Sequence, residues 1–453
     1  MMFFPGTGSR RLRRRGAGRS RVLGLVLAAA VSCAPTLAIA AELESELAKL
    51  LVEHPSIQAA EKRYISATYG IDVAEAGFLP QVNLSTSGGP QKISTPTTRT
   101  TDGDDQFNRT GNVATLFVTH NLFDGDFTES SAQTARLTAE QAAVTLAQTR
   151  QATLFEGIRV YIDVVRQKRL VDLGRENVDN IQQQLNLEDE RVQRGSGIAV
   201  DVLEAKSRLQ IAKERLVGFE GSLRNAAATY KQVFGRAPDI ENMTDPWPPV
   251  ELVPVSLDEA VETAMLNNPA MLNSAASVEI ARERKEGATA DYLPSLDLEG
   301  TMNYERNNEG TTGIRRDYSV VLRASWDIFT GFATPALVNQ AAYEYRASRD
   351  THDLTRRRTT EQVRVAWESL ITTRDRSRLL ENAVNIAAEV YASRLKLRAA
   401  GQDNVINVLD AENQVTTAQI NFTSTAYDVR LASYQLLLTM GLLTAENLNL
   451  PTA

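Results

Sequence analysis

Residues 401–411 read Gly-Gln-Asp-Asn-Val-Ile-Asn-Val-Leu-Asp-Ala, and residues 195–205 read Gly-Ser-Gly-Ile-Ala-Val-Asp-Val-Leu-Glu-Ala. Each stretch begins with glycine and ends in Val-Leu, an acid and alanine, and the two lie 206 positions apart. The same offset relates residues 121–125 to residues 327–331. Because several blocks keep one register, the pattern indicates an internal duplication.

Two earlier blocks lie 214 positions apart: His54-Pro55 matches Asn268-Pro269, and residues 79–84 match residues 293–298. The first copy must therefore carry extra residues before position 121. Residues 85–112 are rich in Ser, Thr, Gly and Asp, so we expect them to form an exposed loop. The predicted organisation has a signal peptide at residues 1–40, a first repeat at 41–236, a Pro-rich linker at 237–256, a second repeat at 257–441 and a C-terminal tail at 442–453.

Long helices are predicted in both repeats. Residues 332–400 contain no glycine and a single proline near their start, and residues 402–440 contain neither. Good helix formers dominate both stretches, and about 65 residues would make a helix roughly 100 Å long. Val363, Trp367 and Leu370 recur at helical spacing, which predicts a buried stripe on each helix.

Each repeat is also predicted to hold a pair of strands, near residues 81–123 and 295–329. From Leu296 to Tyr304 and from Tyr318 to Ile328, apolar and polar residues alternate. A soluble sheet on a core and a membrane barrel would both show this pattern. The charged residues of the polar face (Asp297, Glu299 and Arg323) favour a water-filled interior, so we prefer the barrel.

Residues 1–40 are predicted to be a secretory signal peptide. They contain seven arginines, the apolar run Val22 to Val31, and the small-residue site Ala38-Ile39-Ala40. Cys33, the only cysteine of the chain, lies inside this segment without the leucine that a lipoprotein site would place before it. We therefore expect export without lipidation, and no disulfide or thiolate metal site.

The charge and the motif content exclude several classes of function. The net charge of −7 would become roughly −14 without residues 1–40, which argues against nucleic-acid binding. The three histidines are far apart, and no phosphate loop or nucleophile motif occurs. We predict no cofactor, no metal and no enzymatic activity. A periplasmic or surface coiled-coil protein without a pore remains the alternative, because it would share the signal and the long helices.

Four strands cannot close a membrane barrel around a lumen, since the smallest such barrels use eight. An open sheet edge cannot face lipid, because its backbone groups would lack partners. If the strands enter a membrane, several chains must complete the barrel. The residues alone do not determine how many.

The ordered set of signal, repeat, strand pair and helical hairpin resembles the TolC family of outer-membrane efflux and secretion channels. The stretch from Gly401 to Ala411, followed by a helix that ends at Gly441, is similar to that family's glycine turn and following helix. The resemblance implies a mainly α, mixed α+β fold. It also implies a homotrimer in outer-membrane lipid, with a twelve-stranded transmembrane β-barrel and an antiparallel helical coiled-coil barrel extending into the periplasm.

The resemblance further implies partners and a passive function. A periplasmic adaptor protein would meet the helical tip and couple it to an inner-membrane transporter, driven by ATP or by protons. Cargo would leave through a duct that is gated at the tip. Type I protein secretion and efflux of small molecules both remain open, because the chain itself does not encode the cargo.

The family's gate motifs map onto six residues of this sequence. Asp410 matches an acid of the family's constriction ring, whereas Asn407 replaces the other acid and so removes a charge. Asp201 matches a family acid that holds the gate shut, and we expect it to pair with Arg398. A ring of Asp410 carboxylates would favour cations. The complete set of candidates is Asp410, Asn407, Asp201, Glu204, Arg398 and Asp403.

Overall fold

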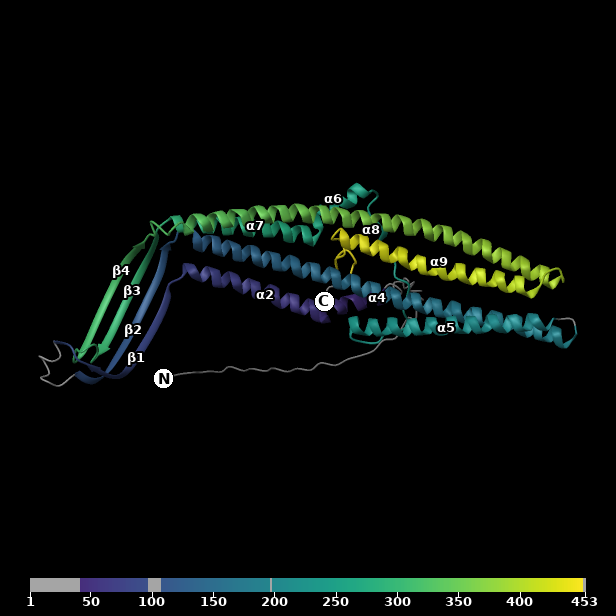
Figure 1. The fold of residues 1–453 in the computed structure, drawn as a ribbon, viewed down its shortest axis with the longest axis horizontal. Coiled ribbons are helices and arrows are strands. Elements are labelled where there is room, and N and C mark those ends of the chain that lie inside the picture. The colour runs from purple at the N-terminus through teal and green to yellow at the C-terminus, as the bar shows by residue number, and fades with distance from the viewer. Residues whose placement is uncertain (1–40, 97–106, 196–197, 451–453) are drawn as a thin grey trace, which may run out of the picture. The chain divides into compact units, whose positions relative to one another are not determined.

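The computed structural model describes residues 41–96, 107–195 and 198–450. In these residues the chain is mainly helical, with one antiparallel sheet of four strands (Figure 1). The predicted signal peptide, including Cys33, lies outside the described residues.

The same order of elements occurs twice along the chain. The first series is α1 (Ala41–Glu53), α2 (Pro55–Glu75), η1 (Ala76–Phe78), β1 (Gln81–Ile93), β2 (Phe107–Phe123), α4 (Phe127–Gln193) and α5 (Ala199–Phe234). A short 3-10 turn, η2 (Val250–Leu252), follows in the linker. The second series is α6 (Leu257–Asn267), α7 (Pro269–Thr289), η3 (Ala290–Tyr292), β3 (Ser295–Arg306), β4 (Ile314–Ser325), α8 (Ala333–Ala399) and α9 (Val405–Thr439).

The short helices break where proline predicts a break. His54 and Asn268 are extended residues that cap α2 and α7, and each side chain accepts a hydrogen bond from the backbone N–H two residues later. Proline then occupies the first helical position, where its missing N–H costs nothing. Both repeats therefore have the same break between two helices, at the matching pairs His54-Pro55 and Asn268-Pro269.

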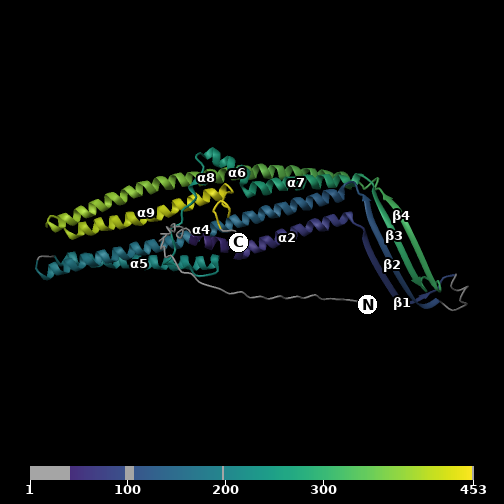
Figure 2. The ribbon, with the colours of Figure 1, turned by 180° about the vertical axis from the view of Figure 1, so that it is seen from behind.

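Helices α4 and α8 each contain 67 residues, so each is roughly 100 Å long. α5 lies antiparallel along α4, and α9 lies antiparallel along α8, in both views of the ribbon (Figures 1 and 2). The turns of both hairpins are at the end of the helices away from the sheet. The predicted long helical hairpins are therefore present in the structure.

The corner between the sheet and each long helix has an unusual backbone. Gly125 and Asp126 precede α4 with φ of 69° and 70°, and Gly331 and Phe332 precede α8 with φ of 63° and 67°. A Cβ at Gly125 would lie 2.9 Å from the carbonyl oxygen of Ala290, which forms part of η3. Glycine is therefore needed for the close approach of the two repeats at this corner.

The strands pair in the order β1-β2-β3-β4, every pair being antiparallel. β1 pairs with β2 from Gln81↔Thr119 to Ile93↔Phe107, but the pairing of β2 with β3 begins only at Asn112↔Arg306. The β1–β2 hairpin therefore extends five residue pairs past the neighbouring strands.

The expectation that residues 85–112 form an exposed loop was wrong for the part that the structure describes. Residues 85–93 and 107–112 belong to β1 and β2. Gly88, Gly89 and Pro90 suggested a turn, yet Pro90 lies in β1, which is an edge strand and so the kind of strand in which proline is tolerated. Residues 97–106 lie outside the described residues.

The two faces of the sheet differ in polarity. One rung across all four strands consists of Leu84, Leu116, Met302 and Tyr318, and we call this side the apolar face. The other side carries polar pairs, including a hydrogen bond of 2.9 Å from the Thr115 hydroxyl to Asn303 Oδ1 and a 2.6 Å ion pair between Arg323 and Glu299. The predicted alternation is thus present in the folded sheet.

The hydrophobic core lies among the helices. Its larger cluster joins α1, α4, α5, α6, α8 and α9, and it includes the fully buried Tyr161, Leu370 and Leu436. Among the described residues, no helix combines the length and the hydrophobicity needed to cross a membrane.

The linker between the two series is held against α4 and α9 by polar and aromatic contacts. Asp245 accepts a hydrogen bond of 2.5 Å from the Tyr427 hydroxyl and pairs with Arg430 at 3.1 Å. The Arg430 guanidinium lies 4.3 Å from the ring centre of Trp247, as in a cation–π contact. This charged, hydrogen-bonded cluster positions the linker together with Ile240, Met243, Leu252 and Val253, which pack against the hydrophobic core.

Replacing Asp245 with Asn should lower the free energy of unfolding by about 1–2 kcal/mol, because hydrogen bonds to a charged group are lost. Guanidinium unfolding followed by tryptophan fluorescence measures this change. Asp239→Asn is the matched control, since Asp239 is in the same linker and its exposed carboxylate accepts from Asn242 alone among the described residues. Equal effects of the two substitutions would contradict the role of the Asp245 cluster.

Candidate gate at the helical tip

The two hairpin tips share a small hydrophobic cluster. It contains Ile181 and Leu185 from α4, Val202 and Leu209 from α5, and Val405 and Leu409 from α9. The two quoted motifs supply four residues of this cluster, which are Val202 and Ala205 from the first and Val405 and Leu409 from the second. The repeated motif therefore packs the tips of the two hairpins against each other.

Asp403 organises the turn between α8 and α9. Its carboxylate accepts from Asn407 Nδ2 at 2.5 Å and from the Asn404 backbone N–H at 2.9 Å, and it pairs with Arg394 at 3.0 Å. The hydrogen bond from Asn407, followed by those from Arg394 and the backbone, holds the pKa of Asp403 below its usual value. Asn404 also caps α9, because its side chain accepts from the Asn407 N–H.

Asp410 and Glu204, the acids at equivalent positions of the two motifs, are joined by one arginine. Arg208 Nη2 lies 2.8 Å from Asp410 Oδ1, and Arg208 Nε lies 3.0 Å from Glu204 Oε1. Arg208 thus links α5 to α9 and leaves the Asp410 side chain 49% exposed. Within this chain the proposed ring acid is paired with a cation.

The predicted ion pair between Asp201 and Arg398 is not formed among the described residues of this chain. Arg398 Nη2 pairs instead with Glu188 Oε2 on α4 at 2.7 Å, and its Nη1 donates to the Asp403 carbonyl. Glu188 is almost completely buried and also accepts from Arg191 at 3.0 Å. Arg398, at the end of α8, therefore reaches α4, whereas Asp201 lies in the first turn of α5, 9% exposed.

Glu412 is a buried carboxyl two residues after Asp410. It is 2% exposed, and neither of its oxygens has a hydrogen-bond partner. Burial raises its pKa to about 7. Tyr391 of α8 lies within electrostatic reach, and burial together with Glu412 raises the Tyr391 pKa to about 12. The tip therefore contains one acid that prefers to be protonated.

Arg208, Glu188 and Glu412 were not among the residues predicted from the sequence. Arg208 could have been found, since Glu204 and Arg208 have the i,i+4 spacing of a helical ion pair. Glu188 had no such signal, because its partner Arg398 is 210 residues away in the sequence. Glu412 resembles any helical surface acid until the packing of α9 is known.

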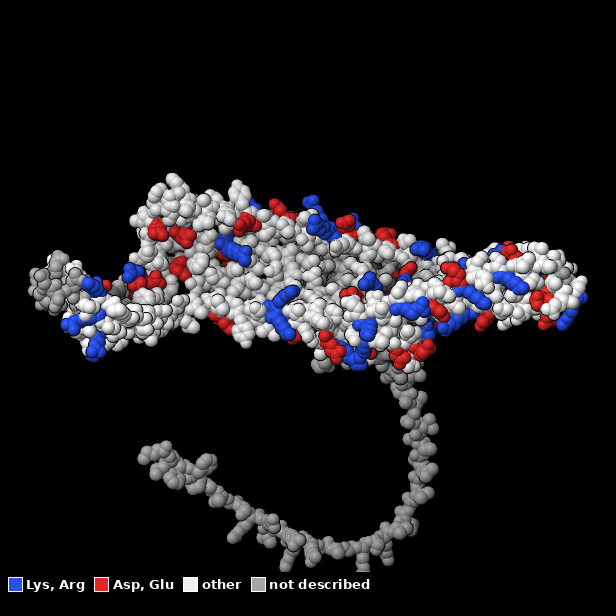
Figure 3. Space-filling view, turned by 60° about the horizontal axis from the view of Figure 1, so that its bottom comes forward, with Lys and Arg blue, Asp and Glu red and all other residues white. Residues whose placement is uncertain are grey.

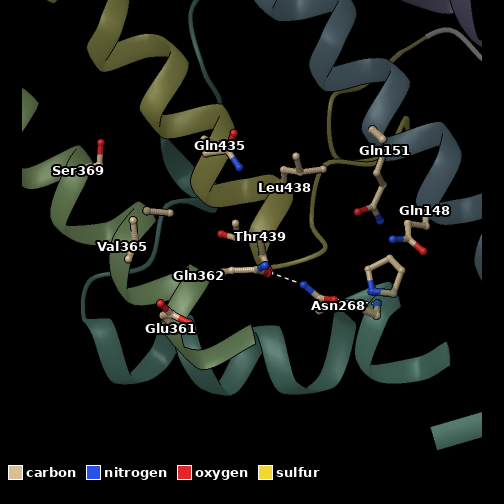
Figure 4. Close-up of a pocket in the computed structure, with 14 residues that line it drawn as sticks. Gln148, Gln151, Asn268, Glu361, Gln362, Val365, Ser369, Gln435, Leu438 and Thr439 are labelled. Carbon is tan, nitrogen blue, oxygen red and sulfur yellow. Dashed lines mark hydrogen bonds between the residues drawn. The ribbon is translucent and has the colours of Figure 1, made fainter. Parts of the chain in front are cut away.

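A cavity of about 740 Å³ lies where the start of α7 meets α4, α8 and α9 (Figure 4). Its lining is rich in amides, and Glu361 is the only charged lining residue. The Asn268 side chain donates to the Thr439 carbonyl at 2.7 Å, and Gln151 donates to the Gly441 carbonyl at 3.0 Å. Asn268 and Gln151 thereby hold the end of α9.

In the described part of the chain, no group of His, Cys, Asp and Glu is arranged to hold a metal ion.

Replacing Glu412 with Gln should make the stability of the protein less dependent on pH. The raised pKa means that the packed state holds the proton more tightly than the unfolded state does. The stabilisation that comes from the protonated Glu412 is therefore fully present below about pH 4.5. It is lost as the pH rises through about 7, which lowers the free energy of unfolding by on the order of 3 kcal/mol.

Unfolding by guanidinium between about pH 5 and about pH 8 measures this loss in wild type and variant. Glu389→Gln on the exposed surface of α8 serves as the control, because it removes the same charge without relieving burial. A wild-type pH profile that Glu412→Gln leaves unchanged would rule out the buried carboxyl as its source.

The sequence profile of the family described as outer membrane efflux protein matches residues 47–236 and residues 260–442. This match covers most of both element series and confirms the family resemblance predicted from the repeated motifs. The family assignment does not depend on any single tip residue, because the two matched segments include the helices, the strands and the corners.

Individual proteins agree with the profile. The chain is 26% identical to outer membrane efflux protein BepC of Brucella suis over 84% of this chain and 81% of that protein. It is 25% identical to alkaline protease secretion protein AprF of Pseudomonas aeruginosa over 89% of this chain and 85% of that protein.

Solved structures share the fold. The crystal structure of outer membrane protein VceC from Vibrio cholerae superposes with a TM-score of 0.75 at 16% identity, covering 88% of this chain and 96% of that one. The chain therefore belongs to the outer membrane efflux protein family, whose members are located in the outer membrane of bacteria.

Proposed function

We propose that this chain forms the exit duct of an export system, with its sheet in the outer membrane and its helices in the periplasm. The observation that carries the proposal is the sheet itself, which has one apolar face, one polar face and two open edges. A membrane barrel needs an apolar exterior and, around a channel, a polar lumen.

The two open edges support assembly from several copies. β1 and β4 each pair on one side only within the chain, so each leaves a row of backbone groups without partners. Such an edge cannot face lipid. Three chains of four strands would close a twelve-stranded barrel, which is an even number within the range of outer-membrane barrels. A homotrimer follows from this count together with the family resemblance.

The repeated element order and the two matched segments support an internal duplication, with repeats at residues 41–236 and 257–441. The linker at residues 237–256 would join them, a signal peptide at residues 1–40 would direct export, and residues 442–453 would form the tail. Within the trimer, two hairpins per chain would continue the barrel as a helical tunnel.

The helical tip is the surface that would meet other components. A periplasmic adaptor would bind there and connect the duct to an inner-membrane transporter, which supplies the energy. Cargo would pass without chemical change. BepC is named for efflux and AprF for secretion of a protease, so relatives of similar distance support both kinds of cargo. A structural coiled coil without a pore would leave the apolar face of the sheet unexplained.

Single-channel conductance of the full-length protein in a planar bilayer tests the proposal. Wild type should give stable, cation-preferring steps that divalent cations block, because carboxylates would line the constriction. Asp410→Asn should weaken the preference for cations. Arg208→Gln should strengthen it, since the Asp410 carboxylate loses its paired cation. Lack of conductance from folded protein would refute the pore, and opposite shifts in selectivity would refute the assignment of Asp410.

A second test concerns the contact between Arg398 and Glu188. Arg398→Gln removes one charge from a largely buried pair that joins the end of α8 to α4. We expect longer and more frequent openings in the same bilayer recordings, because the tip loses a cross-helix bond. Arg194→Gln is the matched control. Arg194 pairs with Glu190 one helical turn earlier at the end of α4, and this pair is exposed and joins no second helix. Openings as rare as those of wild type would exclude a gating role for Arg398.

A further inference from the structure

The apolar face of the sheet ends in basic residues at its loop end. Rungs of Val82, Val118 and Val320 and of Leu84, Leu116 and Tyr318 cover its middle. Toward the loops, Tyr304 pairs with Arg316, and Arg306 pairs with Ile314. Figure 3 shows blue Lys and Arg side chains gathered at this end of the sheet.

The alternation of the strands decides which charges belong to this face. Alternate residues of a strand lie on the same face of a sheet. Arg306 is therefore on the same face as Met302, Arg316 is on the same face as Tyr318, and Lys92 of β1 is on the same face as Leu84. The neighbouring acids Glu305 and Asp317 have the opposite parity and lie on the polar face. The loop end of the apolar face therefore carries three cations and no acid from the described strands, in a protein whose net charge is −7.

The two faces also differ in how their arginines are used. On the polar face, Arg315 pairs with Asp317 at 2.8 Å and Arg323 pairs with Glu299 at 2.6 Å. Within the described residues, Lys92, Arg306 and Arg316 form no ion pair. Arg316 instead lies 5.8 Å from the ring centre of Tyr304, next to the apolar surface. These three cations are available to an external anion.

A shallow groove of about 310 Å³ crosses the same face. It lies over Gly300, whose missing side chain leaves a gap between Val118 and Val320 in the same rung. Leu116, Met302 and Tyr318 complete its apolar lining. The groove offers apolar contact to a chain-like group lying along the strands.

The distance between the groove and the cations matches one leaflet of a membrane. Gly300 and Arg306 are six residues apart, so they are separated by about 20 Å along β3. With a strand tilt of about 40°, this separation corresponds to about 15 Å along the membrane normal, half of a hydrocarbon core of about 30 Å.

We propose that a membrane lipid with a phosphate-bearing headgroup binds this face, its acyl chain in the groove over Gly300 and its phosphate on Arg306 and Arg316. Arginine recognises phosphate with paired, charge-assisted hydrogen bonds. The proposal rests on the proposed function, because it requires the apolar face to contact lipid. It adds a specific lipid to a surface otherwise covered by generic hydrocarbon.

Binding of dioleoyl phosphatidic acid to the full-length protein in detergent, followed by native mass spectrometry, tests this inference. Dioleoylglycerol, which lacks the phosphate, is the control ligand. The variant Arg306→Gln/Arg316→Gln should bind the phosphatidic acid roughly 30-fold more weakly than wild type, or about fivefold per arginine. Wild type should retain little dioleoylglycerol.

Arg109→Gln/Arg315→Gln is the matched control variant. It removes the same number of charges near the loops, but from residues on the polar face of the sheet. It should bind phosphatidic acid as wild type does. Equal losses in the two double variants, equal binding of both ligands, or no loss in either variant would overturn the lipid site. If the Arg306/Arg316 double variant does not conduct like wild type, its folding is altered. Lipid binding is then compared between wild type and the single variant Arg316→Gln.

Bilayer conductance separates the two proposals. A wild-type protein that conducts but binds both ligands equally would overturn the lipid site and leave the proposed function intact. A wild type that does not conduct would remove the proposed function, and with it the reason to place the apolar face in lipid.

Discussion

The constraint on which the rest of the structure depends is the need of every backbone N–H and C=O in a membrane for a partner. A four-stranded sheet with two open edges does not meet it alone. In the proposed trimer, closure through further copies would explain why one chain carries only two β-hairpins. It would also explain why these β-hairpins are joined to helices long enough to form the wall of a tunnel. The glycine corners connect the two parts of the chain, over residues 124–126 between β2 and α4 and over residues 326–332 between β4 and α8.

The tip solves a different physical problem, because its helices end in water. Apolar residues from both repeats hold the two hairpins together, and charged residues surround them. Most of these charges are already paired within the chain, as in the contacts of Arg208 and Arg398. Rearranging the tip therefore means exchanging one set of ion pairs for another, which costs less than exposing isolated charges. Glu412 is the exception, since it is buried without a partner.

Much of this fold could be predicted from the sequence, because its signals are local and strong. Proline pairs marked the helix breaks, stretches without glycine marked the long helices, and alternation marked the strands. The hairpin at residues 85–112 was misread, since its glycines and serines suggest a loop and only pairing with β2 makes it a strand. The site was harder to predict. Which acid faces which arginine depends on how helices from distant parts of the sequence pack, so Glu188 could not be assigned to Arg398 from spacing alone.

If the sheet forms the proposed barrel, the unequal length of its two β-hairpins locates the surface of the bilayer. Beyond the rung of Asn112 and Arg306, the ladder narrows from four strands to two, and the inner edge of β2 at residues 107–111 has no strand beside it. Lipid cannot solvate that edge, but water can. In the proposed barrel, the hydrocarbon would therefore stop below this rung, and the extra five pairs would extend about 17 Å above it into the aqueous exterior. A difference in β-hairpin length would thus set the depth of the protein in the membrane.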